Sequence, residues 1–411
     1  MRLLQRKGAP IHIQACIKAG SRHNTVPGLA HFWEHMLLAG TTAHPSKRAI
    51  AKALEEIGGS FEATTDADLL RLTISIPHSG GFEFASNVLN EILTTSAYTE
   101  EALENERSVI LNEQNDRLKD PTYILQHTLM RLMYVEYERN FNNLGTAASV
   151  SAIQREDITE FATKNLTADR VIFVVSGDID IDAVQKSLAT ISLAADNNYA
   201  TPQIPSIQHD KTVSVLDRPD TQSNLAIGFR CDTKNPEELA GLILIQQLAM
   251  GRSNPFITAL RYNRGLVYGG KTLLWDFNGT SVFSIGTSCA SKNVVEVYSI
   301  MHEVLAGMLH QGISDTVCEA AQTKTDSHYR FNLQTSKQWL DAEVAAIRHS
   351  IEGGIDTNAL TILQYIDKMD AHTLTETFKK FFASEKAYHA VIGHVSEEDK
   401  RQILIQYAKI K

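Results

Sequence analysis

One short pattern occurs in both halves of the chain: an apolar strand that ends in a glycine and an acidic segment. FVVSGDIDID spans residues 173–182, and AVIGHVSEED, at residues 390–399, is similar to it. The chain has 411 residues, which is too long for a single hydrophobic core of ordinary size. The two observations together predict two copies of one α+β unit.

Local patterns predict the elements of the first half. Residues 11–17 alternate between apolar and polar side chains, which predicts a half-buried strand. Turn-forming and capping residues bound the elements that follow. We expect helices at 29–38, 46–57, 82–93 and from Thr99 to a break near Asp120, and strands at 61–65, 69–77 and 171–176.

A linker separates the two predicted units. Residues 194–211 show no periodicity and contain two prolines among many turn-forming residues. We place the linker at 195–211, so that the first domain spans 1–194 and the second spans 212–411. In the second domain we expect strands at 213–215, 224–229 and 388–393 and a helix at 236–250.

Composition narrows the class of protein. Apolar residues make up 43% and charged residues 21%, as in folded soluble proteins. No apolar stretch reaches the roughly 18 to 20 residues of a membrane helix, and no signal segment is evident, so we expect a cytoplasmic protein without a membrane partner. A net charge of −9 argues against nucleic-acid binding. Four cysteines lie far apart without a CxxC pair, which predicts buried free thiols: Cys16, Cys231, Cys289 and Cys318.

The segment HFWEH, on the first predicted helix, has the spacing of a metal clamp. His31 and His35 are four residues apart, so their imidazoles lie on one helix face. Two neutral imidazoles and one carboxylate form a zinc site that leaves a fourth position for catalytic water. Glu34 lies beside His35 and is placed to take a proton from that water as a general base. The competing interpretation is two surface histidines that fall one turn apart by chance.

A carboxylate to complete such a site is available on the long helix that begins at Thr99. Glu106 and Glu113 are seven residues apart and therefore share a face of that helix. Either one could be the third metal ligand. The alternative is a solvated acidic helix face formed together with Glu101 and Glu104.

Three segments, GLAHFWEHMLLAGT, GGSFEATTDAD and ENERSVILNEQNDRLKDP, resemble the pitrilysin and mitochondrial processing peptidase family in order and spacing. The resemblance covers nearly the whole chain and is to a short, two-domain member of bacterial type. It implies one zinc ion per chain, held by His31, His35 and Glu113, with Glu34 activating the water. Glu106 matches the family's supporting acid, which orients the metal ligands. Further matches are Gly20 to Arg22, Leu144-Gly145 and Val174 to Asp180.

The resemblance also implies a fold. It is an α+β fold of two related domains, each a mainly antiparallel sheet with helices packed on one face. In the second domain, LRYNRGLVY looks like the family's LRxxxGLxY segment and contains Arg261 and Tyr268. In the family these groups contact substrate opposite the zinc, and both can donate hydrogen bonds to an oxyanion. Taken alone, an arginine and a tyrosine near a glycine are more often surface and packing residues.

Family members enclose their catalytic chamber with four such domains, and this chain has two. We therefore predict a homodimer in which each chain offers Arg261 and Tyr268 to the zinc of the other. A heterodimer with a related, metal-free subunit is the competing arrangement. The predicted function is a zinc metalloendopeptidase that cuts peptides or unfolded segments inside a dimeric clamshell chamber. The alternative is a structural or peptide-binding subunit that is inactive without its partner.

Two features depart from the family pattern. An edge strand near Ser60 to Thr65 is expected to capture the peptide as an added strand. Relatives carry Asn-Ala on that strand, whereas this chain has Glu62-Ala63, which favours a cationic residue in the peptide. Only residues 1–7 precede Gly8, where relatives have a longer hairpin, so we expect one edge of the first sheet to be short.

Overall fold

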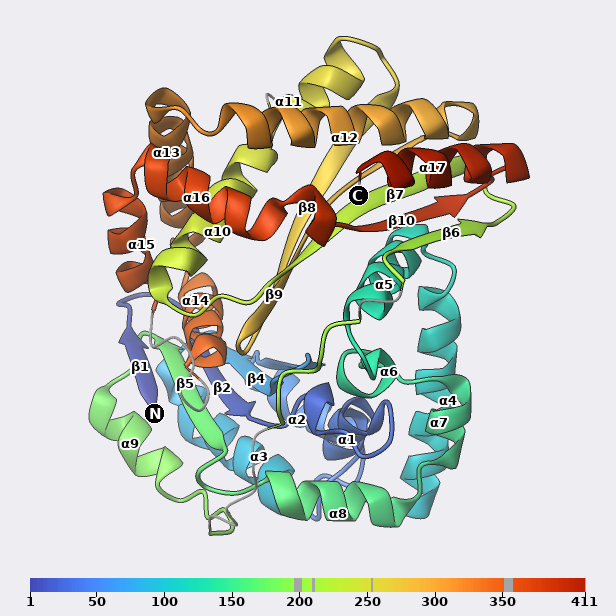
Figure 1. Ribbon diagram of the computed structural model, residues 1–411. Helices are drawn as coiled ribbons and strands as arrows, with labels where there is room; N and C mark the ends of the chain where they lie inside the picture. Colours follow the sequence, from blue (N-terminus) through green and yellow to red (C-terminus); the bar gives the residue numbers. More distant parts are fainter. Residues whose placement is uncertain (196–201, 209–210, 253, 351–357, 411) are drawn as a thin grey trace. The chain divides into compact units, whose positions relative to one another are not determined.

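The computed structural model describes residues 1–411 except 196–201, 209–210, 253, 351–357 and 411 (Figure 1). The chain divides into two compact units. Unit 1 contains Met1–Asp116, Glu136–Gln203 and Arg330–Glu352; unit 2 contains Arg117–Val135, Ile204–Tyr329 and Gly353–Lys411. The linker predicted at 195–211 stays a prediction, because residues 196–201 and 209–210 lie outside the described residues.

Unit 1 is built on a five-stranded sheet. Its strands lie in the order β1 (Arg2–Gln5), β5 (Val171–Gly177), β2 (Ile11–Ile17), β4 (Leu70–Ile76) and β3 (Ser60–Thr65). β1 runs parallel to β5, and the other neighbours are antiparallel. The strands predicted in this half are confirmed. The short strand β1 forms one edge of the sheet, and β3 forms the other.

Helices cover one face of this sheet. The apolar side chains of β2 at positions 11, 13, 15 and 17 pack with α1 and α3 into one core. The helices predicted from caps and periodicity are confirmed; Ser46, for example, accepts a hydrogen bond from Ala49 N at the start of α2. The helices of this layer and its surroundings are α1 (Leu29–Leu38), α2 (Lys47–Glu55), α3 (Phe82–Thr94), α4 (Glu100–Arg117), α6 (Tyr137–Asn140), α7 (Ala147–Ala152), α8 (Arg155–Asn165) and α9 (Ile181–Leu188).

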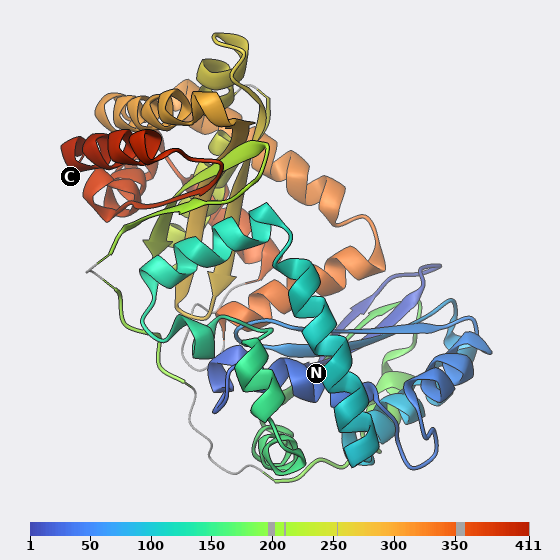
Figure 2. The ribbon, with the colours of Figure 1, turned by 90° about the vertical axis from the view of Figure 1, so that its right-hand side faces the viewer.

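The opposite face of the unit 1 sheet carries one further helix, α14 (Ser336–His349), which comes from the second half of the chain (Figures 1 and 2). Leu340, Val344 and Ile347 pack there against Cys16 and its neighbours in the sheet. β2 is therefore buried on both faces, so the prediction of a half-buried strand is wrong in this respect. Its alternation between apolar and polar residues reflects two different cores and not a solvent face.

Unit 2 repeats the sheet of unit 1. Its strand order is β6 (Val213–Asp217), β10 (Tyr388–Gly393), β7 (Gln222–Cys231), β9 (Thr280–Ala290) and β8 (Val267–Phe277), with β6 parallel to β10 and the rest antiparallel. β10 thus occupies the place that β5 has in unit 1. The predicted repeat of one α+β unit is confirmed.

The repeated glycine at the end of these two strands has a steric cause. Gly177 and Gly393 adopt φ of +131° and +141°. A Cβ atom would collide with the backbone of Pro10 at the first position and with the backbone of Gln222 and Ser223 at the second. Both the φ values and the close approach require glycine. The sequence pattern therefore marks the same turn in each unit.

The helices of unit 2 follow the same plan. One layer packs with the apolar face of β7, and α5 (Pro121–Met133), from the first half of the chain, packs on the other face against β7 and β10. A Cβ at Gly228 would meet Leu129 and Met133 of α5, so glycine permits this close contact. The other helices are α10 (Pro236–Ala249), α11 (Pro255–Ile257), the π-helical η3 (Thr258–Tyr262), α12 (Val294–Gln311), α13 (Asp315–Asn332), α15 (Ala359–Lys368), α16 (Ala371–Phe382) and α17 (Glu397–Ile410).

Two expectations from composition can be compared with the structure. The four cysteines are buried and free, as predicted. Among the described residues, none of the helices combines the length and the apolar character that a membrane crossing needs.

The packing of α14 on unit 1 can be tested with Leu340→Ala. Leu340 is fully buried against the sheet, so its truncation should cost about 2–5 kcal/mol of stability. The matched control is Leu118→Ala, at a leucine that is 57% exposed, where the cost should stay within about 0.5 kcal/mol. Hydrogen exchange of the β2 and β5 amides measures the effect locally. Equal protection in the two variants would contradict the packing described for α14.

Candidate metal centre

The first turn of α1 is held by contacts that lie outside the helix. Asn24 Oδ1 accepts a hydrogen bond from Ala30 N at 2.8 Å, which satisfies a free amide of that turn. Gly28 precedes the helix with φ of +89°, and a Cβ there would press against the Leu144-Gly145 backbone. Gln114 of α4 donates a hydrogen bond to Leu144 O. The Leu144-Gly145 pair thus links the start of α1 to α4.

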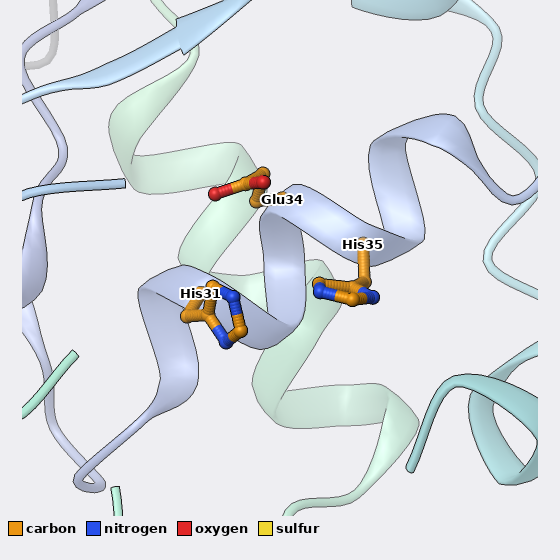
Figure 3. Close-up of side chains that lie close together, drawn as sticks. All are labelled: His31, Glu34 and His35. Atoms are coloured by element: carbon orange, nitrogen blue, oxygen red, sulfur yellow. The ribbon is translucent and has the colours of Figure 1, made fainter. Parts of the chain in front are cut away.

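His31 and His35 project from α1 with Glu34 between them in sequence (Figure 3). Their ring centroids are 4.7 Å apart, at an interplanar angle of 73°. His31 is only 8% exposed, and its neighbours Phe32 and Trp33 are buried in the unit 1 core. The two imidazoles are therefore held on a helix that is anchored along its other faces.

α4 brings a carboxylate to both imidazoles. Glu113 Oε2 lies 3.7 Å from His31 Nε2 and 3.9 Å from His35 Nε2. Two ligands bound about 2.1 Å from a tetrahedral zinc ion lie about 3.4 Å apart. The observed spacings are slightly wider than this, so small side-chain movements would place all three atoms around one ion. The residues present fit a zinc ion.

Glu106 occupies the other side of His35. Its Oε2 lies 2.8 Å from His35 Nδ1, and the hydrogen bond between them leaves Nε2 facing Glu113. Burial raises the pKa of Glu106, but the hydrogen bond and the charge of His35 outweigh burial and hold that pKa below its usual value. A carboxylate on the remote nitrogen is the usual means of orienting a metal-binding histidine. The two glutamates of α4 therefore have different positions relative to the imidazoles.

Glu34 is buried and has one strong hydrogen bond. The Thr65 hydroxyl, at the end of β3, donates to Glu34 Oε2 at 2.6 Å, and Asn143 holds the Thr65 carbonyl at 2.8 Å. Burial raises the pKa of Glu34, although the Thr65 bond and His35 act in the opposite direction. A carboxylate with a raised pKa is suited to act as a general base near neutral pH. Sequence reasoning missed Thr65, because nothing local to β3 indicates a contact with α1.

The same imidazoles also lie close to Glu34. His31, Glu34 and His35 offer ligand atoms within 4.8 Å of one another, and Glu34 is thus a second geometric candidate for the third ligand. Two features argue for Glu113 instead. Glu34 Oε2 already accepts the Thr65 hydrogen bond, and Glu113 Oε2 faces the Nε2 atoms of both histidines.

Arg261 and Tyr268 belong to unit 2, and the structure brings them together. Arg261 Nη1 donates to Tyr268 O at 2.7 Å, and its guanidinium lies 4.8 Å from the centre of the Tyr268 ring. Tyr268 is 87% exposed. Arg261 lies on the π-helical η3, a rare conformation that often occurs at functional sites. The predicted approach of these two residues to zinc stays a prediction.

The predicted peptide-capturing strand is an edge strand: β3 pairs with β4 at the end of the sheet. Glu62, on this strand, has a partner that sequence reasoning missed. Lys337 Nζ of α14 lies 2.7 Å from the Glu62 carboxylate and 3.2 Å from Asp341. The predicted preference of Glu62 for a cationic peptide residue stays a prediction, and Lys337 would compete with such a residue.

The two histidines and two glutamates offer the donor set of a divalent-metal site, and comparison with known proteins gives the family. Residues 7–146 match the family model "Insulinase (Peptidase family M16)", and residues 152–325 match "Peptidase M16 inactive domain". The chain belongs to peptidase family M16, as the motifs predicted.

Individual relatives agree with this assignment. An uncharacterized zinc protease of Mycobacterium leprae is 25% identical over 332 residues, which cover 79% of this chain and 74% of the relative. The beta subunit of the mitochondrial-processing peptidase of Dictyostelium discoideum is 25% identical over 201 residues, which cover 46% of this chain and 42% of the relative. A peptidase M16 inactive domain from Pseudomonas fluorescens has the same fold, with a TM-score of 0.84 at 17% identity over 96% of this chain and 95% of the other.

Glu106→Gln tests the role of the Glu106–His35 hydrogen bond. Loss of the carboxylate removes a charged partner from His35 Nδ1, so zinc affinity should fall by about 10- to 100-fold. Competition with a chelator measures the affinity, and total metal analysis gives the zinc bound per chain. The control is Glu101→Gln, at an exposed position on the same helix. If Glu106→Gln binds zinc as tightly as Glu101→Gln, the assigned role is wrong.

Proposed function

We propose that this protein is a zinc metallopeptidase that hydrolyses peptide bonds of peptides or unfolded segments. One observation carries the proposal: Glu113 Oε2 of α4 faces the Nε2 atoms of His31 and His35 at 3.7 and 3.9 Å. These three residues would hold the metal, and Glu106 would orient His35. Zinc held there would supply polarisation of the scissile carbonyl and a lowered pKa for water.

Glu34 would act as the general base. It takes a proton from the attacking water and afterwards can return it to the leaving amine. Its carboxylate is buried, so the proton transfer takes place away from bulk solvent. The Thr65 hydroxyl, by donating to Oε2, fixes the direction in which the carboxylate points. A peptide bound along the free edge of β3 would pair with the strand that contains Thr65.

Arg261 and Tyr268 would contact the substrate from a second chain. Both can donate to the oxyanion of the tetrahedral intermediate. We propose a homodimer that encloses a chamber, with each chain supplying these residues to the zinc site of the other. A cytoplasmic location is part of the proposal, and no nucleic-acid or membrane partner is proposed.

A second candidate is a structural or peptide-binding subunit of a heterodimeric peptidase. The match of residues 152–325 to a model called an inactive domain supports it. The match of residues 7–146 to the other M16 model favours an enzyme, because that stretch contains His31, Glu34, His35, Glu106 and Glu113. A purely structural subunit has no need of a buried base at Glu34.

Glu34→Gln separates the two candidates. The substitution keeps the size of the side chain but removes the base, so cleavage of quenched peptides should fall by about 10²- to 10⁴-fold. Zinc content should stay at one ion per chain, which shows that the loss is catalytic. Unchanged cleavage by Glu34→Gln would contradict the mechanism. Zinc binding without any cleavage by the unaltered protein would favour the subunit interpretation.

Mixing two inactive variants tests the composite site. A Glu34→Gln chain supplies intact Arg261 and Tyr268, and a Tyr268→Phe chain supplies an intact zinc site. If the two chains complete each other's site, the mixture should recover part of the activity through one intact site per dimer. Native mass spectrometry establishes that subunits have exchanged. Exchange without any recovery would reject the trans arrangement.

A further inference from the structure

Unit 2 contains a cavity of about 560 Å³, which we call the unit 2 cavity. It lies on the α5 face of the sheet, between the first turns of α5 and strands β7, β8 and β9. Its described lining residues all belong to unit 2, so it does not depend on how the units are arranged. Tyr268 is one of these residues, and the cavity is therefore next to a group already proposed to contact substrate. Its volume is in the range of ligand-binding pockets.

The hollow lies beside an irregularity in β8. Pairing between β8 and β9 shifts in register between Val267 and Gly270. Gly269 and Gly270 follow each other at this irregularity, and a Cβ at Gly269 would meet no atom within 4 Å. The corresponding edge strand of unit 1, β3, pairs without such a shift. The fold therefore does not require the hollow, and bulges often mark functional sites.

The walls of the unit 2 cavity offer hydrogen-bond donors. Gln126 of α5 and Gln222 and Asn224 of β7 contribute carboxamides, and Lys271 of β8 contributes an ammonium group. Ser288 Oγ donates to Asn224 Oδ1 at 2.6 Å, so that bond uses the oxygen of Asn224 and not its amide nitrogen. Within the described part of the chain, the side chains of Gln126, Gln222 and Lys271 make no hydrogen bond or ion pair.

The charges of the residues that line the unit 2 cavity indicate which ligands it can bind. None of the described lining residues is an aspartate or a glutamate, although the whole chain has a net charge of −9. Among the described lining residues, Lys271 is the single one with a charged side chain, and an ammonium group is a donor only. Its strongest partners are anionic acceptors, which in an unmodified peptide are carboxylates, and carboxamide NH₂ groups can complete the hydrogen bonds of such an anion. A cationic side chain would find no counter-charge there.

We propose that the unit 2 cavity binds a carboxylate of the peptide substrate, from an aspartate or glutamate side chain or from the C-terminus. Lys271 supplies the counter-charge, and the amides of Gln126, Gln222 and Asn224 donate hydrogen bonds. Leu125, Val267 and other apolar residues of the wall limit competition from water. The proposal rests on the proposed function, because it assumes that peptides are the ligands.

Binding of labelled peptides to full-length Glu34→Gln protein tests the proposal without cleavage. Three peptides of one neutral sequence are compared by fluorescence anisotropy: one amidated at the C-terminus, one amidated with a single internal glutamate, and one with a free C-terminal carboxylate. At least one carboxylate peptide should bind roughly 10-fold more tightly than the neutral one, as for a charge-assisted hydrogen bond. The two carboxylate peptides distinguish a side-chain source from a terminal one.

Substitution of Lys271 tests whether the tighter binding of carboxylate peptides depends on the unit 2 cavity. Lys271 is exposed, so Lys271→Met and Lys271→Glu should fold; the first should abolish the preference and the second should reverse it. Lys324→Glu makes the same charge change at an exposed position on α13, away from the cavity, and should leave the preference intact. Equal binding of all three peptides, no binding of any peptide, or a preference that survives Lys271→Glu would overturn the proposal. Peptide cleavage without the carboxylate preference would reject this site alone, and the preference without cleavage would reject only the hydrolytic function.

Discussion

His31 and His35 lie one helical turn apart on α1, and the candidate metal centre depends on that spacing. Two imidazoles on one helix hold an ion firmly when the helix is fixed and a carboxylate adds a third ligand. α4 brings Glu113 Oε2 to 3.9 Å from His35 Nε2, and it also places Glu106 Oε2 at 2.8 Å from His35 Nδ1. The core under Phe32 and Trp33 fixes the helix itself. The geometry of the candidate centre therefore depends on the packing of two helices that are distant in sequence.

Among the described residues, the candidate centre has no counterpart in the second copy of the duplicated architecture. In each unit, a helix follows the central strand: α1 after β2 in unit 1, and α10 after β7 in unit 2. α10 has the sequence PEELAGLILIQQLA, which contains no histidine. Unit 2 differs again at its edge strand, where β8 has a register shift and two glycines that β3 lacks. The two copies thus share a sheet but carry different chemistry.

Much of the fold was predictable because its signals are local. A cap such as Ser46 acts through atoms a few residues away, so sequence patterns report it. The glycine at 177 is marked locally by its positive φ, although the backbone that approaches it, at Pro10, is distant in sequence. The packing of α14 has no such signal. Cys16 and Leu340 meet although more than three hundred residues separate them, and the polar positions of β2 then predicted a solvent face that does not exist.

The candidate centre, too, could be predicted only as far as local sequence patterns reach. Helical spacing was enough to pair His31 with His35 and Glu106 with Glu113. It could not decide which glutamate faces the imidazole Nε2 atoms, because that depends on how far α4 is displaced along its axis relative to α1. The family resemblance favoured Glu113, and the distances agree with it. The Thr65–Glu34 hydrogen bond could not be predicted, since it joins an edge strand to a buried helix.

Anomalous diffraction at the zinc edge, from crystals of the zinc-loaded protein, measures the central claim directly. We expect one zinc peak within about 2.0–2.2 Å of His31 Nε2, His35 Nε2 and a carboxylate oxygen of Glu113. A peak bound by other residues, or a structure in which Glu113 points away from the ion, would contradict it.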